Sequence, residues 1–83
     1  MRINYNKQAL KYLAKLDRPT RQRLKDDILH LADEPPEGDI RPMSGQENLY
    51  RLRIGGFRII FEIDVDNNII EIRKISPRGD AYK

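Results

Sequence analysis

The sequence predicts an α+β fold: an N-terminal strand and an antiparallel helical hairpin precede a three-stranded antiparallel meander, with the helices on one face of the sheet. Three observations predict it. Apolar residues between positions 7 and 33 recur with the spacing of a helix, whereas those between 49 and 75 alternate with the period of a strand. Two turn sequences, at 55–56 and 66–68, divide the second stretch into three strands. A chain of 83 residues is expected to form a single domain, residues 1–83.

The first elements are a short strand and a helix. Ile3 and Tyr5 alternate with polar residues, which predicts a strand over residues 2–5. The apolar spacing then changes to that of a helix over residues 7–16. Asn6 precedes this segment and is a suitable N-cap, because its side chain can accept a hydrogen bond from the first turn.

The second helix is expected from about Thr20 to Asp33, after a connection at residues 17–19. Pro35-Pro36 should end it, because a residue that precedes proline avoids the helical conformation. Residues 34–48 are rich in proline, glycine and acidic side chains, and they predict a loop. The short connection between the two helices favours an antiparallel hairpin.

The three strands of the meander are expected at 49–54, 57–63 and 69–75, with Gly55-Gly56 as a two-residue turn. Because side chains alternate across a strand, each strand can be divided into a core side and an outer side. The core sides hold Tyr50, Leu52, Ile54, Phe57, Ile59, Phe61, Ile63, Ile70 and Ile72.

The outer side of these strands gathers positive charge. It holds Arg51, Arg53, Arg58 and Arg73, together with Glu62 and Glu71, which are expected to be cross-strand partners of Arg58 and Arg73. Lys74 falls on the core side of the alternation, near the strand end, where it can reach water. Arginine presents a planar fork of donors that suits phosphate. A solvated polar sheet face is the alternative interpretation.

The composition limits the kinds of partner, metal site and membrane association that this protein can have. Sixteen basic and 13 acidic residues give a net charge of +3, which permits a nucleic-acid partner without establishing one. The absence of cysteine excludes disulfides and thiolate metal sites, and no apolar run approaches the roughly 20 residues of a membrane span. We expect a cytoplasmic protein with no cofactor, no metal and no membrane partner. His30, the only histidine, is expected to be structural or solvent-facing.

The order of elements and the block Leu49–Ile63, with its Tyr-Arg-Leu-Arg and Phe-Arg-Ile-Ile-Phe sequences, resemble the RelE/ParE toxin superfamily, and its RelE branch in particular. The similarity extends over essentially the whole chain and includes the tail Pro77–Lys83. It implies a toxin of a type II toxin–antitoxin system that cleaves messenger RNA on the ribosome.

The resemblance also implies roles for individual residues. The catalytic candidates are Arg53, Arg58, Arg78 and Tyr82, and Arg51 is a substrate-binding candidate. Arg73 and Lys74, which are basic residues of the last strand, are two further substrate-binding candidates that the resemblance does not supply. Cleavage would proceed by attack of the ribose 2′-hydroxyl on the adjacent phosphorus, with arginines stabilising the developing negative charge in place of a metal. Tyr82 is a candidate for stacking on a base or for donating a proton.

The implied partners are a RelB-like antitoxin with an acidic amphipathic segment, the ribosome and its message, and operator DNA only through the antitoxin complex. Two alternatives stay open at this point. A ParE-like toxin shares the fold but poisons DNA gyrase, and a catalytically inactive relative would only bind its antitoxin.

Overall fold

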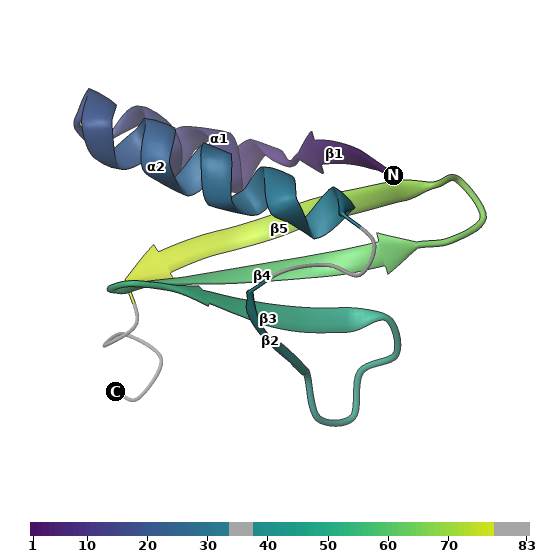
Figure 1. The fold of residues 1–83 in the computed structure, drawn as a ribbon. Helices are drawn as coiled ribbons and strands as arrows, with labels where there is room; N and C mark the ends of the chain where they lie inside the picture. Colours follow the sequence, from purple (N-terminus) through teal and green to yellow (C-terminus); the bar gives the residue numbers. More distant parts are fainter. Residues whose placement is uncertain (34–37, 78–83) are drawn as a thin grey trace.

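The computed structural model describes residues 1–33 and 38–77, and it forms two helices packed on one face of a five-stranded sheet (Figure 1). The elements are β1 (Arg2–Tyr5), α1 (Lys7–Ala14), α2 (Arg18–Leu29), a 3-10 turn (His30–Ala32), β2 (Asp39–Pro42), β3 (Leu49–Ile54), β4 (Phe57–Asp64) and β5 (Ile69–Pro77). The strand order is β1-β5-β4-β3-β2. The predicted α+β class and the β3–β4–β5 meander are confirmed. None of the described helices is long and apolar enough to cross a membrane.

One of the two edge strands of the sheet, β2, lies in a segment that was expected to be a loop. Residues 39–42 form β2, which pairs antiparallel with β3 and places Ile40 opposite Leu52. The prediction of a loop over 34–48 is therefore wrong for this segment, because β2 is short, ends in proline and has a single partly buried apolar side chain. At the other edge, β1 pairs parallel with β5, so the sheet is mixed.

Both helices begin at a side-chain cap. The Asn6 side chain accepts a hydrogen bond from the Ala9 amide at 3.0 Å, as expected. Asp17 caps α2 by accepting from the Thr20 amide at 3.1 Å, so α2 begins at Arg18 and residues 18–19 are helical where a loop was expected. Proline is compatible with the first helical turn because the amides there have no partner within the helix. Pro35 and Pro36 lie outside the described residues.

The core lies between the helices and the meander. Its most buried side chains are Ala9, Leu13, Leu24, Ile28, Leu31, Leu52, Ile54, Ile59, Phe61, Ile70, Ile72 and Ile75. Phe61 is 1% exposed, and its ring stacks on Tyr50 with centroids 5.6 Å apart. The assignment of core and outer sides from the alternation is therefore confirmed for β3 and β4.

A β-bulge changes the alternation within β5. On β4, Phe61 pairs with Ile72 and the preceding residue, Ile60, pairs with Lys74. Arg73 therefore has no residue opposite it on β4 and is the extra residue of the bulge. After the bulge Ile75 points into the core and is fully buried, while Lys74 is exposed beside Ile60 on the outer face. The expectation that Lys74 falls on the core side is therefore wrong, because strict alternation does not anticipate an inserted residue.

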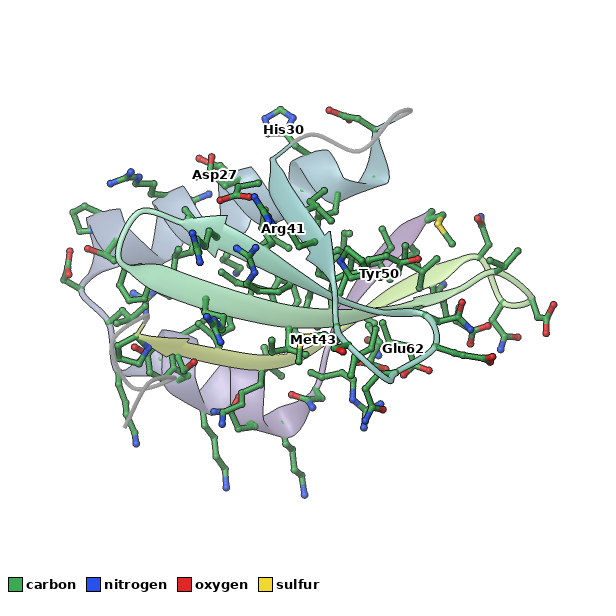
Figure 2. All side chains as sticks on the ribbon, turned by 90° about the horizontal axis from the view of Figure 1, so that it is seen from below. Asp27, His30, Arg41, Met43, Tyr50 and Glu62 are labelled. Carbon is green, nitrogen blue, oxygen red and sulfur yellow. The ribbon has the colours of Figure 1, made fainter. Side chains whose placement is uncertain are left out.

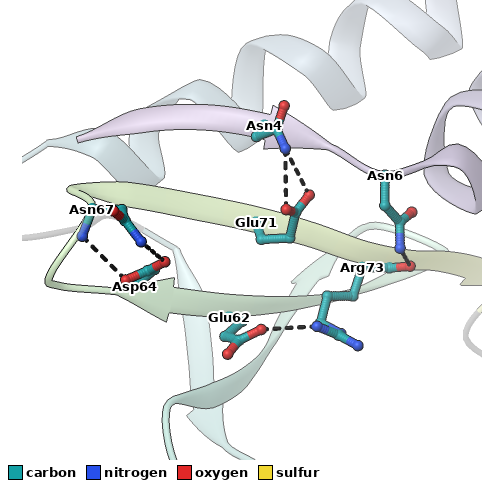
Figure 3. Close-up of polar contacts among 7 residues, drawn as sticks. All are labelled: Asn4, Asn6, Glu62, Asp64, Asn67, Glu71 and Arg73. Carbon is teal, nitrogen blue, oxygen red and sulfur yellow. Dashed lines mark hydrogen bonds and ion pairs between the residues drawn. The ribbon is translucent and has the colours of Figure 1, made fainter.

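Side-chain amides continue the pairing of β5 beyond β1. The last β1 pair is Tyr5 with Ile72, and beyond it the Asn6 amide nitrogen donates to the Arg73 carbonyl at 2.7 Å (Figure 3). Gln8 follows: its oxygen accepts from the Ile75 amide at 3.2 Å, and its nitrogen donates to the Ile75 carbonyl at 3.4 Å. These contacts hold the start of α1 against β5.

Candidate nucleic-acid interface

Figure 2 views the sheet from its outer face, opposite the helices. The strand register arranges the side chains of this face in rows that run across the strands. One row is Ser76, Arg58, Arg53 and Asp39, and the next is Lys74, Ile60, Arg51 and Arg41. A third row holds Glu71, Glu62 and Leu49. We call Arg41, Arg51, Arg53, Arg58 and Lys74 the cationic face. It contains one carboxylate, Asp39, at its β2 end.

Like charges lie opposite each other at three places on the outer face of the sheet. Arg53 pairs with Arg58, Arg51 with Arg41, and Glu62 with Glu71. Directly opposed like charges destabilise a sheet. An arrangement that stabilised the sheet would place arginines opposite glutamates. Here most of the arginines are separated from the glutamates, and this concentrates positive charge where an external anion can bind.

The expected neutralisation of the arginines by glutamates occurs in one case. Arg73 Nη1 lies 2.8 Å from Glu62 Oε1 (Figure 3), which confirms a cross-strand ion pair for Arg73. Arg58 lies opposite Arg53 and Ser76 instead, and Glu71 accepts hydrogen bonds from the Asn4 amide at 3.0 and 3.1 Å. The two glutamates therefore contact Arg73 and Asn4, and the carboxylate that lies opposite the cationic face is Asp39 on β2.

Arg51 is the most buried member of the cationic face, at 8% exposure. Its Nη1 is 3.8 Å from Asp39 Oδ2, and this nitrogen is buried without a hydrogen bond among the residues described. Burial, followed by the charge of Arg53, lowers the pKa of Arg51 from its ordinary value. An arginine remains protonated nonetheless. A phosphate oxygen within hydrogen-bonding distance would supply the missing acceptor.

A groove of about 540 Å³ adjoins the cationic face at the end of β5. Its lining combines the positive charges of Arg58 and Lys74 with the apolar surfaces of Tyr12, Met43 and Ile60. Bases stack on aromatic and other flat apolar surfaces while phosphates bind cations, so this combination suits a nucleotide.

The structure brings together four of the residues expected from the sequence: Arg51, Arg53, Arg58 and Lys74. Arg73 lies apart, because it is paired with Glu62 and borders a separate depression with Gln46 and Glu47. Arg78 and Tyr82 fall outside the described residues.

Arg41 was missed from the sequence. It joins the cationic face only because β2 places it opposite Arg51. The available signal was weak: Ile40 lies between Asp39 and Arg41, as in a strand, but Pro42 follows at once. A three-residue alternation that ends in proline is difficult to distinguish from a loop.

Replacing Arg41 with glutamine should stabilise the protein and weaken RNA binding. The substitution removes one of two directly opposed positive charges, Arg41 and Arg51, and such pairs are worth about 0.2–1 kcal/mol. The expected rise in melting temperature is about 1–8 °C for a domain of this size. Arg73→Gln is the matched control, because it breaks an ion pair and should not raise the melting temperature. A destabilised Arg41→Gln protein would contradict the view that the charges are segregated at a cost to stability.

Comparison with known proteins agrees with this geometry. The family model described as the ParE toxin of type II toxin–antitoxin systems matches residues 3–82. A protein that carries the name toxin RelE1, from Methanocaldococcus jannaschii, is 37% identical over 84 residues, covering 98% of this chain and 93% of that protein.

Solved structures show the same fold. A chain of the archaeal RelE–RelB complex from Pyrococcus horikoshii superposes with a TM-score of 0.75 at 32% identity, covering 94% of both chains. A chain of the RelB–RelE antitoxin–toxin complex from Methanococcus jannaschii superposes with a TM-score of 0.74 at 27% identity, covering 95% of this chain and 94% of that one. The isolated RelE toxin of E. coli superposes with a TM-score of 0.77 at 18% identity, covering 98% of this chain and 89% of that one. At that identity the similarity shows the fold alone.

The family model spans nearly the whole chain, and the RelE1 relative shares more than a third of its residues over almost its full length. The chain therefore belongs to the RelE/ParE superfamily of toxins of type II toxin–antitoxin systems, and it is RelE-like.

Proposed function

We propose that this toxin is an endoribonuclease that cleaves messenger RNA on the ribosome and so stops translation. The observation that carries the proposal is the pair of opposed arginine couples, Arg53 with Arg58 and Arg51 with Arg41. Four guanidinium groups on adjacent strands suit the phosphodiester backbone of a single strand. The groove beside them is lined by a few residues of α1, β4 and β5 and by Met43, so a large partner that positions the RNA fits the expected dependence on the ribosome.

The proposed reaction is an internal transfer at phosphorus. The ribose 2′-oxygen attacks the adjacent phosphorus, the bond to the 5′-oxygen breaks, and a cyclic phosphate is formed. The 2′-hydroxyl loses a proton and the leaving oxygen gains one. Arg58 and Arg78 would stabilise the charge that builds on the phosphoryl oxygens, while Arg51 and Arg53 would hold the flanking phosphates and align the attack. Tyr82 is the candidate proton donor or stacking partner.

The proposed protein partner is a RelB-like antitoxin. Two of the solved relatives above 25% identity are RelB–RelE complexes. An acidic amphipathic segment would complement the cationic face, and operator DNA would be bound only through the antitoxin complex. Amide hydrogen exchange with and without the product of the neighbouring gene tests this part, and protection of β3 and β4 is the expected result.

Induced expression with separate translation and gyrase readouts tests the main proposal. We expect growth arrest with rapid loss of protein synthesis, and cuts in ribosome-bound message that are absent from the same RNA free in solution. DNA gyrase is included because the matching family model carries the name of the ParE branch. Gyrase-linked DNA breaks with intact message would replace the nuclease by the ParE-like alternative. Antitoxin binding without toxicity would favour an inactive binding module.

A further inference from the structure

A second polar pocket, of about 330 Å³, lies between α2 and the end of β3. Arg23 and Asp27 line it from one side of α2, four residues apart, and His30 lines it from the start of the 3-10 turn that follows. Arg53, Ile54 and Gly55 line it from β3 and the following turn. We call it the edge pocket. Asp27 and His30 can be followed along α2 in Figure 2.

The edge pocket opens where β3 loses its outer partner. β2 begins at Asp39, which pairs with Arg53, so β3 past Arg53 has no partner strand on that side among the residues described. Gly38 and Gly55 border the opening and contribute no side chains. The volume falls within the range of about 300–1,000 Å³ that is usual for small-ligand sites.

Arg53 belongs to both the edge pocket and the cationic face. The row from Ser76 through Arg58 to Arg53 crosses the sheet toward this edge and ends at the Asp39 carboxylate on β2, so a phosphodiester backbone would leave the row at Arg53. Arg23 lies immediately beyond, because its Nη2 would be 3.5 Å from a Cβ built on Gly55. A phosphodiester backbone that follows the row therefore reaches Arg53 and then Arg23.

The charges of the edge pocket are mixed. Arg23 and Arg53 are opposed by Asp27, and His30 Nδ1 lies 2.9 Å from Asp33 Oδ2. Counting Arg23, Arg53 and Asp27, the lining has one net positive charge. A site of this kind suits one phosphate on a chain that is already held elsewhere, and it does not suit a separate polyanion.

We propose that the edge pocket is a second subsite for single-stranded RNA, which takes a phosphate and its nucleoside after the chain has crossed the cationic face. The proposal rests on the proposed function, because it extends the path of the same RNA. It places Arg23 as a contact to the RNA that only substrates long enough to reach α2 can make.

Binding of 2′-O-methyl RNA, which cannot be cleaved by 2′-hydroxyl attack, tests the proposal with the full chain. Affinities of a trinucleotide and a dodecanucleotide are measured by fluorescence anisotropy over a range of salt concentrations. Arg23→Gln should weaken the dodecanucleotide about two- to fivefold, as expected for one exposed charge, and leave the trinucleotide unchanged. The salt slope for the longer RNA should fall by about 0.7. Asp27→Asn should act in the opposite direction.

Two further variants separate the subsite from the proposed function. Lys25→Gln removes an exposed charge from α2 outside the edge pocket and should leave both affinities unchanged. Arg58→Gln should weaken both RNAs. If Arg58→Gln does so and Arg23→Gln affects neither length, the edge pocket is not an RNA subsite and the cationic face stands. If Arg58→Gln also affects neither, the cationic face does not bind free RNA and the subsite fails with it, whereas the proposed function is decided separately by cleavage of ribosome-bound message. If Arg23→Gln weakens only an acidic peptide, the pocket belongs to a protein partner.

Discussion

Arg58→Ala should reduce cleavage of ribosome-bound message by about 10²–10³-fold, because loss of one preorganised group that stabilises transition-state charge has a cost of that size. The side chain lies on the outer face between Arg53 and Ser76, away from the core residues of the same strand. The substitution removes a repulsion with Arg53, so the melting temperature should not fall. Single-turnover cleavage at saturating toxin measures the effect on chemistry separately from binding.

Lys25→Ala is the matched control for Arg58, because Lys25 is an exposed cation on α2 outside both the cationic face and the edge pocket. It should cleave and arrest growth like the unaltered protein. Arg78→Ala, in the segment outside the described residues, should behave like Arg58→Ala. Cleavage at the unaltered rate by both arginine variants would show that the proposed site is wrong.

Phe61→Ala should remove a large share of the free energy of unfolding at 25 °C and lower the urea midpoint strongly. Phe61 is 1% exposed, and a buried phenylalanine replaced by alanine costs about 3–5 kcal/mol. A chain of 83 residues is expected to have about 4–12 kcal/mol of stability in total. The ring also stacks on Tyr50, so its loss leaves a second aromatic residue poorly packed. Urea unfolding followed by circular dichroism measures the change.

Val65→Ala is the control for Phe61, because Val65 is 72% exposed in the turn between β4 and β5. Its midpoint in urea should shift little. A Phe61→Ala protein with an unchanged midpoint would contradict the position of this strand in the core, and with it the placement of Arg58 on the outer face.

The central hairpin was predictable because its signals are local. Residues 49–63 alternate apolar and polar side chains, and the glycine pair supplies a turn with Gly55 at a φ of 54°. The faces of β3 and β4 follow from that alternation, and so does the grouping of Arg51, Arg53 and Arg58.

The remaining errors concern features that depend on neighbouring strands. β2 is a strand because β3 supplies its hydrogen-bond partners, so Arg41 could not be assigned to the cationic face from its own sequence. Lys74 was misplaced because a bulge at Arg73 reverses the alternation, and nothing in the composition of β5 marks the inserted residue. The first error left Arg41 out of the site, so the sequence analysis underestimated the cationic face, whereas Lys74 was a candidate that was assigned to the wrong side of its strand.

The parallel pairing of β1 with β5 also sets the point in synthesis at which the sheet can be completed. Arg2 pairs with Ile69, so the first strand must wait for a partner made 67 residues later. Ile70 and Ile72, which complete the core, are translated after both arginine-bearing strands. Contacts at such separations form late. A nascent chain that already contains Arg51 to Arg58 therefore lacks the completed sheet that holds them, so the cationic face is assembled only after β5 has been made.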